Sequence, residues 1–188
     1  VTFKRYIHDP ENEGSIVNNK IFRIIEDEEN NLWIFAGTNI DRYNRERDAF
    51  DHLSLETDCM NSGDCELDEH QNEMWFPTWK GIYRIIPPYS RISDHTIKPG
   101  KIIRYEHDAS DPLTMACSNL ANVFCFSRNY QPGTLWFESQ TGLGKMMKNN
   151  DKRKNNRSVI FRYYSYGDGF TGNKFNGILE DKNGNIWI

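Results

Sequence analysis

The sequence of 188 residues lacks the features that would place it inside a membrane or on nucleic acid. No window approaches the roughly 18 consecutive apolar residues of a membrane span, so no span is expected within these residues. Lys and Arg number 23 against 27 Asp and Glu, and this balance gives no reason to expect nucleic-acid binding. Hydrophobic residues make up only 37%, but aromatic residues make up 13%, and their large buried area argues against disorder.

The cysteines lack the spacing of a metal site. No two of the four cysteines have the CxxC spacing that is usual for a zinc site, so no metal ion is expected. No other cofactor is expected either. Cys59 and Cys65 flank a loop-like segment, residues 60–64, and are able to close a small disulfide in an oxidising compartment. The alternative, which general burial tendencies favour, is that the cysteines are small buried thiols.

A tryptophan recurs within four similar strand-like segments. The tryptophans are Trp33, Trp75, Trp136 and Trp187, at intervals of 42, 61 and 51 residues. Residues 19–27 also align without a gap with residues 173–181. A period of about 40–50 residues is typical of a β-propeller blade, which is a sheet of four strands. The sequence therefore predicts an all-β fold, a partial β-propeller of about three four-stranded antiparallel blades plus flanking strands.

The strands and turns within each repeat define the expected units. They are blades over residues 18–57, 63–107 and 117–166, the outer strand of a preceding blade over 1–7, and the first half of another blade over 174–188. Pro77 is expected to interrupt its strand ladder. Three and a half blades do not close a ring of about 4–8, so each end would expose an apolar face. The expected partner is the rest of the parent propeller or a second copy in a homodimer.

The repeat resembles a known family. Its pattern, Ile-x-Glu-Asp-x-x-(Asn/Gly)-Asn-Leu-Trp-Ile followed by a Gly-(Ile/Leu)-x-Arg-Tyr-like strand, is similar to the two-component regulator propeller repeat. Residues 24–43 and 178–188 carry the closest matches, and residues 166–170 resemble the inter-blade link of that family. The resemblance implies the periplasmic sensor region of an inner-membrane-anchored hybrid two-component system of Bacteroides-type bacteria, with its kinase outside these residues. It also implies a dimeric sensor that detects breakdown products of polysaccharides.

Propeller geometry indicates where a ligand would bind. The turns between second and third strands and the links between blades share one face, around the central channel. Trp79 is outside the repeat pattern, whereas the recurring tryptophans are expected to pack between blades. Amides, a cation and an aromatic ring suit an oligosaccharide. The candidate ligand-binding residues are Asn39, Trp79, Lys80, Asn119, Gln140 and Thr141.

No catalytic residue is expected. His8 and His107 occupy equivalent repeat positions, which favours a structural role. Glu26-Asp27 and its repeat Glu180-Asp181 are interpreted as turn acceptors, because adjacent strand residues point to opposite faces. The basic stretch 145–157 is interpreted as a solvated hairpin loop, with a patch for an anionic glycan as the alternative.

Three functions remain open at this stage. The first is an oligosaccharide-sensing propeller of a hybrid sensor kinase. The second is a scaffold or dimerisation propeller without a ligand site of its own. The third is a glycan-active propeller enzyme.

Overall fold

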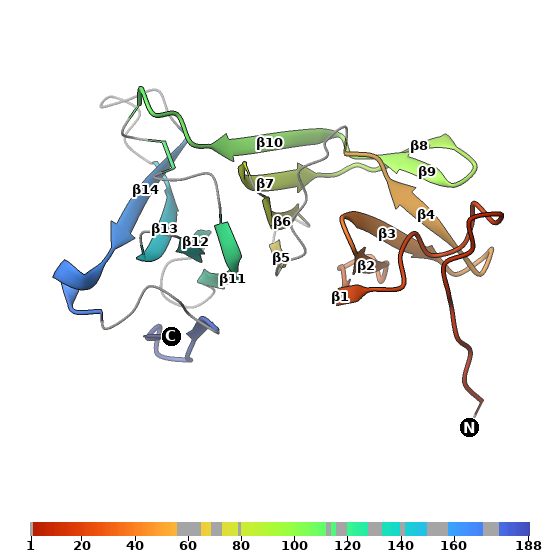
Figure 1. Cartoon of the computed structure of the whole chain (residues 1–188), viewed down its shortest axis with the longest axis horizontal. Helices are drawn as coiled ribbons and strands as arrows, with labels where there is room; N and C mark the ends of the chain where they lie inside the picture. Colours follow the sequence, from red (N-terminus) through yellow and green to blue (C-terminus); the bar gives the residue numbers. More distant parts are fainter. Residues whose placement is uncertain are drawn as a thin grey trace.

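The computed structural model describes residues 2–55, 65–68, 73–78, 80–111, 114–115, 120–127, 133–139, 142–149, 158–170 and 177–188. Within these ranges the regular structure is β, apart from one turn of 3-10 helix, η1 (Tyr166–Asp168). The described part contains no helix that is long and apolar enough to cross a membrane. The sheets stand side by side in an arc, with their innermost strands on the concave side (Figure 1).

Three four-stranded antiparallel units follow one another along the chain, and two further strands begin a fourth. Blade 1 contains β1 (Ile21–Glu26), β2 (Leu32–Ala36), β3 (Asn39–Asn44) and β4 (Ala49–Leu53). Blade 2 contains β5 (Glu66–Asp68), β6 (Glu73–Thr78), β7 (Gly81–Ile86) and β10 (Lys101–Glu106). Blade 3 contains β11 (Leu120–Ser127), β12 (Thr134–Ser139), β13 (Gly142–Lys148) and β14 (Val159–Tyr164). The half-blade contains β15 (Leu179–Glu180) and β16 (Ile186–Trp187), and the predicted fold class is confirmed.

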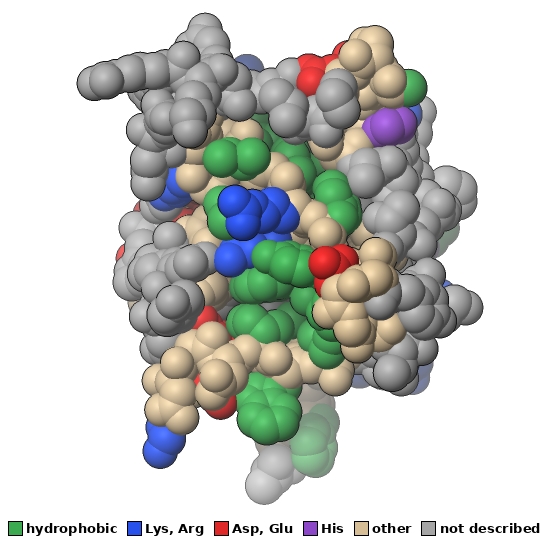
Figure 2. All heavy atoms as spheres, turned by 90° about the vertical axis from the view of Figure 1, so that its left-hand side faces the viewer, with side chains coloured by type: hydrophobic (Ala, Val, Ile, Leu, Met, Phe, Trp, Pro, Cys, Tyr) green, Lys and Arg blue, Asp and Glu red, His purple; other side chains and the backbone are tan. Residues whose placement is uncertain are grey.

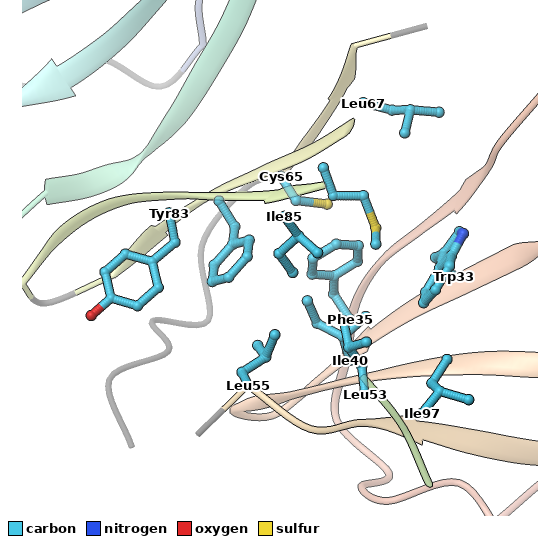
Figure 3. Close-up of a cluster of buried hydrophobic side chains, with 12 residues drawn as sticks. Trp33, Phe35, Ile40, Leu53, Leu55, Cys65, Leu67, Tyr83, Ile85 and Ile97 are labelled. Carbon is cyan, nitrogen blue, oxygen red and sulfur yellow. The ribbon is translucent and has the colours of Figure 1, made fainter. Parts of the chain in front are cut away.

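Each blade has two apolar faces, because successive strand residues point to opposite sides of a sheet. We call the face with the recurring tryptophan the forward face and the other the backward face. Trp33 and Ile40 on the forward face of blade 1 form one buried cluster with backward-face residues of blade 2 (Figure 3), namely Leu67, Met74, Phe76, Tyr83 and Ile85. Trp75 and Ile82 of blade 2 pack in the same way on blade 3, against Leu135, Phe137 and Met146. The predicted packing of these tryptophans between blades is confirmed.

The forward face of blade 3 is only partly covered. Trp136 and Leu143 pack against Ile178 and Ile186 of the half-blade. Figure 2 views this end of the arc and shows a band of hydrophobic side chains crossed by Lys and Arg. A hollow of about 270 Å³ remains, and its lining residues are Trp136, Leu143, Tyr164, Phe170, Ile186 and Ile188. Among the described residues, this surface of blade 3 therefore stays partly open.

An aspartate organises the first turn of blade 1 and of the half-blade. Asp27 Oδ1 accepts hydrogen bonds from the backbone N–H groups of Glu29 and Asn31, and Asp27 Oδ2 accepts one from Trp33 Nε1 at 2.8 Å. Asp181 repeats the arrangement and accepts from Trp187 Nε1 at 3.0 Å. Hydrogen bonds from Asn185 and Trp187 lower the pKa of Asp181 to about 2. The interpretation of these carboxylates as turn acceptors is confirmed.

A cation lies on the indole ring of every complete blade. Arg42 stands 5.8 Å from the centroid of Trp33, Arg84 5.1 Å from that of Trp75, and Lys145 4.6 Å from that of Trp136. Burial lowers the pKa of Lys145, which belongs to β13 and not to a loop. Of the basic stretch, residues 150–157 lie outside the described part, between β13 and β14.

The cysteines are described only in part. Cys65 is fully buried in the cluster between blades 1 and 2, and its burial does not separate the two alternatives. Cys59 lies outside the described residues, so its pairing with Cys65 stays a prediction.

A hairpin of blade 2 joins the sheet of blade 1. It consists of β8 (Ser90–Ser93) and β9 (Thr96–Lys98), which lie in sequence between β7 and β10. β9 pairs in parallel with β4, the outer strand of blade 1, and extends that sheet to six strands. The N–H groups of His52 and Ser54 donate to the carbonyls of His95 and Ile97 at 2.7 and 2.8 Å. Blades 1 and 2 are thus joined by a continuous ladder as well as by apolar packing.

Asp51 on β4 holds this hairpin through an ion pair with Arg91 on β8. Its carboxylate is fully buried and accepts charge-assisted hydrogen bonds from Arg42, Arg47 and Arg91. Arg91 belongs to β8 and contacts both carboxylate oxygens, at 2.9 and 3.0 Å. These hydrogen bonds hold the pKa of Asp51 below its usual value, although its burial acts in the opposite direction.

Two local expectations differ from the structure. β6 runs through Pro77, which pairs with Ile82, so the expected interruption is wrong. The described pairs between β5 and β6 run from Glu66 with Trp75 to Asp68 with Glu73 and do not include Pro77. Residues 2–7, expected as an outer strand, form no ladder, since no described strand lies beside them to supply hydrogen bonds.

His52 ties the segment before blade 1 to β3 and β4. Its Nδ1 lies 2.8 Å from the buried Asp41 Oδ1, and its Nε2 lies 2.7 Å from the carbonyl of Glu13. Because both ring nitrogens face acceptors, the doubly protonated imidazolium fits best. The hydrogen bond to Asp41 raises the pKa of His52 above 6.5, against the effect of burial.

This contact predicts a pH dependence of stability. The stabilisation by His52 is complete below pH 6.5 and is lost as the pH rises through the raised pKa of the folded state. NMR titration of the imidazole is expected to give a pKa above 6.5, and Asp41→Asn is expected to lower it. His52→Gln should flatten the fall in melting temperature over this range. A His52 pKa at or below the ordinary value would contradict the prediction.

Candidate functional site

The link before blade 1 and the turn between β2 and β3 meet at one end of the blade. Gly37 in this turn donates its N–H to the carbonyl of Lys20 in the link, at 2.9 Å. The amide of Asn18 packs against Gly37, while its Oδ1 accepts from Lys20 N at 2.8 Å. In blade 1, therefore, link and turn share a face, as the propeller geometry requires.

The corresponding turns of blades 2 and 3 are built alike. Thr78 Oγ1 accepts the N–H groups of Lys80 and Gly81, each at 3.1 Å, and donates to the carbonyl of Gly81. Ser139 Oγ donates to the carbonyl of Gly142 in the same way, at 2.8 Å. Both glycines have positive φ. A Cβ on Gly81 or Gly142 would lie about 2 Å from the carbonyl oxygen of Tyr105 or Tyr164, on the outer strand of the same blade. A buried hydroxyl thus marks the start of each turn, and a glycine with positive φ marks its end.

The structure describes two of the predicted ligand residues. Lys80 is exposed on the turn between β6 and β7. Asn39 is exposed at the start of β3, at the place that Gly81 takes in blade 2. Trp79, Asn119, Gln140 and Thr141 lie outside the described residues, so their grouping with Lys80 stays a prediction.

A polar hollow lies elsewhere on blade 1, between its first turn and the turn from β3 to β4. Its volume is about 310 Å³, and residues 29–31 and 42–46 line it. Arg45 crosses the gap and donates to Glu26 Oε1 and to the carbonyl of Asn30. This hollow is not among the sites that the sequence predicts. The asparagines of both turns are its signal in the sequence, but the same residues also fit ordinary turns.

The repeated histidines are structural, as predicted. His8 Nδ1 lies 2.9 Å from the carbonyl of Ile16, and His107 makes the same contact with the carbonyl of Met115. In each link, the next residue is an aspartate whose N–H donates to Ser15 or Thr114 at 3.0 Å. Among the described residues there is no cluster of three or more side chains suited to a metal ion.

The chain is similar to known proteins in sequence over a short segment and in fold over most of its length. The Two component regulator propeller family matches residues 169–188. No curated protein shows significant similarity to the chain. Two crystal structures from B. thetaiotaomicron share its fold.

Both structures are extracellular domains. One belongs to a protein described as the one component system BT4673, with a TM-score of 0.61 and 17% identity over 92% of this chain. The other belongs to a protein described as the hybrid two component system BT3049, with a TM-score of 0.58 and 20% identity, also over 92%. The chain covers 20% of each neighbour. The chain therefore has the fold of a segment of these extracellular domains, and its residues 169–188 match the Two component regulator propeller family.

Proposed function

We propose that this chain is a ligand-sensing propeller segment of a hybrid two-component sensor. It lies in the periplasm as part of an inner-membrane-anchored protein and passes its signal to a kinase outside these residues. The matched repeat at residues 169–188 and the extracellular neighbours support this proposal. The observation that carries it is the face on which inter-blade link and turn meet, with Lys80 and Asn39 exposed on turns of this type.

The ligand that suits this face is an oligosaccharide derived from a polysaccharide. Sugars present hydroxyl groups for hydrogen bonds and a flat ring face for stacking. Lys80 and Asn39 supply donors and an acceptor, and Trp79 would supply the stacking ring. The hydroxyl-and-glycine turn fixes the backbone of Lys80, which favours a site that is formed before the ligand arrives.

The test is a double substitution on the turn, Trp79→Ala with Lys80→Ala. Isothermal titration with two probes, a neutral xylo-oligosaccharide and an acidic oligogalacturonide, should identify the sugar that binds. The double variant is expected to weaken its binding by about tenfold or more, which corresponds to about 1.4 kcal/mol. Lys98→Ala, which removes an exposed lysine on β9, serves as the matched control and should bind like the wild type. Equal affinity of the double variant and the control would overturn the assignment.

A scaffold or dimerisation function is the second candidate, favoured by apolar hollows of about 310 and 270 Å³ on blades 1 and 3. In that case the chain binds neither sugar, and its partner is another protein surface. Titration of the wild type with both probes separates the two functions, because only the sensing propeller gives heat of binding.

A further inference from the structure

Three segments of the chain meet at His52 on β4. Its imidazole bridges Asp41 Oδ1 on β3, at 2.8 Å, and the carbonyl of Glu13 in the link before blade 1, at 2.7 Å. Its backbone N–H donates to the carbonyl of His95, in the turn between β8 and β9. The ring of His95 lies against Gly14 of the link, where an added Cβ would come within 2.7 Å of His95 Cε1. The link, the outer strands of blade 1 and the β8–β9 hairpin therefore share one junction.

The link before blade 1, residues 8–17, is built as a unit, and we call it the entry loop. Ser15 Oγ accepts the N–H of Asp9 at 3.0 Å and donates to the carbonyl of Asp9 at 2.9 Å. Ile16 anchors the end of the loop in a buried cluster with Phe50 of blade 1. Because these hydrogen bonds lie within the loop, the rest of it can shift as a body when its contacts with the blade change.

The Asp41–His52 pair carries most of the polar contact between the entry loop and blade 1. Asp41 is fully buried, and while its Oδ1 faces His52, its Oδ2 accepts the N–H of Val17 at 2.8 Å. The ring of His52 holds the loop a second time, at the carbonyl of Glu13. A third hydrogen bond, donated by the N–H of Phe50 to the loop, does not involve the pair. Two of these three hydrogen bonds therefore depend on the pair.

This pair is not part of the repeat. Asp41 and His52 face each other across β3 and β4. In the same register, the other two complete blades have Tyr83 with Arg104 and Gly144 with Tyr163. Met115, in the link before blade 3, still packs on its blade in a buried cluster. A link can thus pack on a blade without such a pair, so the pair gives blade 1 a property of its own.

The charge of the imidazole decides whether both contacts are favourable. The imidazolium gives the buried Asp41 carboxylate a counter-charge and donates from both ring nitrogens. A neutral ring that donates to Asp41 turns the lone pair of Nε2 toward the carbonyl oxygen of Glu13, and it leaves the carboxylate without a counter-charge. The titratable residues that contact His52 or act on its charge are Asp41 on β3, Asp51 on β4, Glu13 in the entry loop and His95 in the hairpin turn.

We propose that His52 is a proton-operated latch for the entry loop. The imidazolium holds the loop on blade 1, and loss of the proton frees it at Glu13 and Val17. Asn18 follows Val17 directly, and its amide packs against Gly37 in the turn between β2 and β3. The latch therefore passes the protonation state of His52 to the face on which link and turn meet. This property belongs to the chain alone and goes beyond the proposed sensing function.

The test is amide hydrogen exchange of the 188-residue chain, followed by NMR from about pH 6 to about pH 9 and corrected for the intrinsic effect of pH. Protection of the Val17 N–H is expected to fall by about fivefold or more, with the midpoint at which the His52 imidazole titrates. The resonance of Gly37 should shift with the same midpoint. The N–H of Ser54, which donates to β9 and lies outside the latch, should keep its protection.

Three substitutions separate the latch from a merely structural contact. His52→Gln, which cannot take up a proton, should leave Val17 weakly protected at every pH. His52→Lys, which stays charged over this range, should keep Val17 protected throughout. His95→Gln is the matched control, since it removes the other histidine of the junction and should leave the pH step in place. Circular dichroism checks that each variant keeps its β structure.

Four outcomes would overturn the proposal. They are constant protection of Val17 in the wild type, a pH step that persists in His52→Gln, a step that disappears in His95→Gln, and a parallel loss of protection at Ser54. The last would mean that the whole blade opens and not the loop alone. Because no sugar takes part, each result leaves the proposed sensing function to its own test.

Discussion

Asp51→Ala is expected to lower the free energy of unfolding by about 3 kcal/mol, a large part of the stability of a typical domain. The carboxylate is fully buried and serves three guanidinium groups, so its removal leaves Arg42, Arg47 and Arg91 to repel one another. The guanidinium groups keep some access to water, which places the effect at the lower end of the range for a broken buried ion pair. Denaturation with urea measures the loss.

The same substitution is expected to release the β8–β9 hairpin from blade 1. Hydrogen exchange should then be faster at the N–H groups of His52 and Ser54, which donate to the hairpin. Arg45→Ala is the control, since it removes an exposed ion pair with Glu26 and should cost less than about 0.5 kcal/mol. If Asp51→Ala costs no more than this control, the buried cluster does not anchor the hairpin.

Asp27→Ala is expected to destabilise the chain by about 2–3 kcal/mol. The alanine removes the acceptor of two backbone N–H groups and leaves the buried Nε1 of Trp33 without its hydrogen bond at the centre of the contact between blades 1 and 2. A lost hydrogen bond is most costly where a buried donor is left behind, which is the situation of this indole. Thermal and urea unfolding provide the measurement.

Asp181→Ala provides the matched control, because the half-blade contains the same turn around an exposed tryptophan. Its effect should be clearly smaller, since water can replace the lost acceptor. Asp27→Asn, which retains one side-chain oxygen, should fall between the wild type and Asp27→Ala. Equal losses from Asp27→Ala and Asp181→Ala would show that burial of the indole does not set the cost.

The repeated part of the fold could be predicted because its signals are local. The spacing of the tryptophans marks the blades, and the aspartate that precedes Trp33 marks a turn that recurs at Asp181. Alternate residues of a strand point to the same face of the sheet, which places the tryptophans between blades, as the clusters around Trp33 and Trp75 show. Each of these features depends on residues close together in the chain.

The features that the sequence did not reveal depend on distant pairs. Arg91 and Asp51 are 40 residues apart, and nothing near either residue indicates that a hairpin of blade 2 pairs with β4 of blade 1. His52 likewise finds acceptors on Asp41 and on Glu13, which belong to a strand and to a link. For the candidate site, the repeat correctly predicts the turn that carries Lys80, whereas the choice of ligand depends on side chains that the repeat does not specify.

The β8–β9 hairpin has a consequence for the order in which the chain assembles. β9 adds to β4, a strand that is synthesised well before it, so blade 1 is in place as a template when the hairpin leaves the ribosome. When two strands lie far apart in sequence, closing the loop between them costs entropy before their contacts form. An edge strand that is already folded lowers the risk that the incoming strand pairs wrongly. The ladder across the junction of blades 1 and 2 therefore favours one order of folding, in which the β8–β9 hairpin of blade 2 is completed on the edge of blade 1.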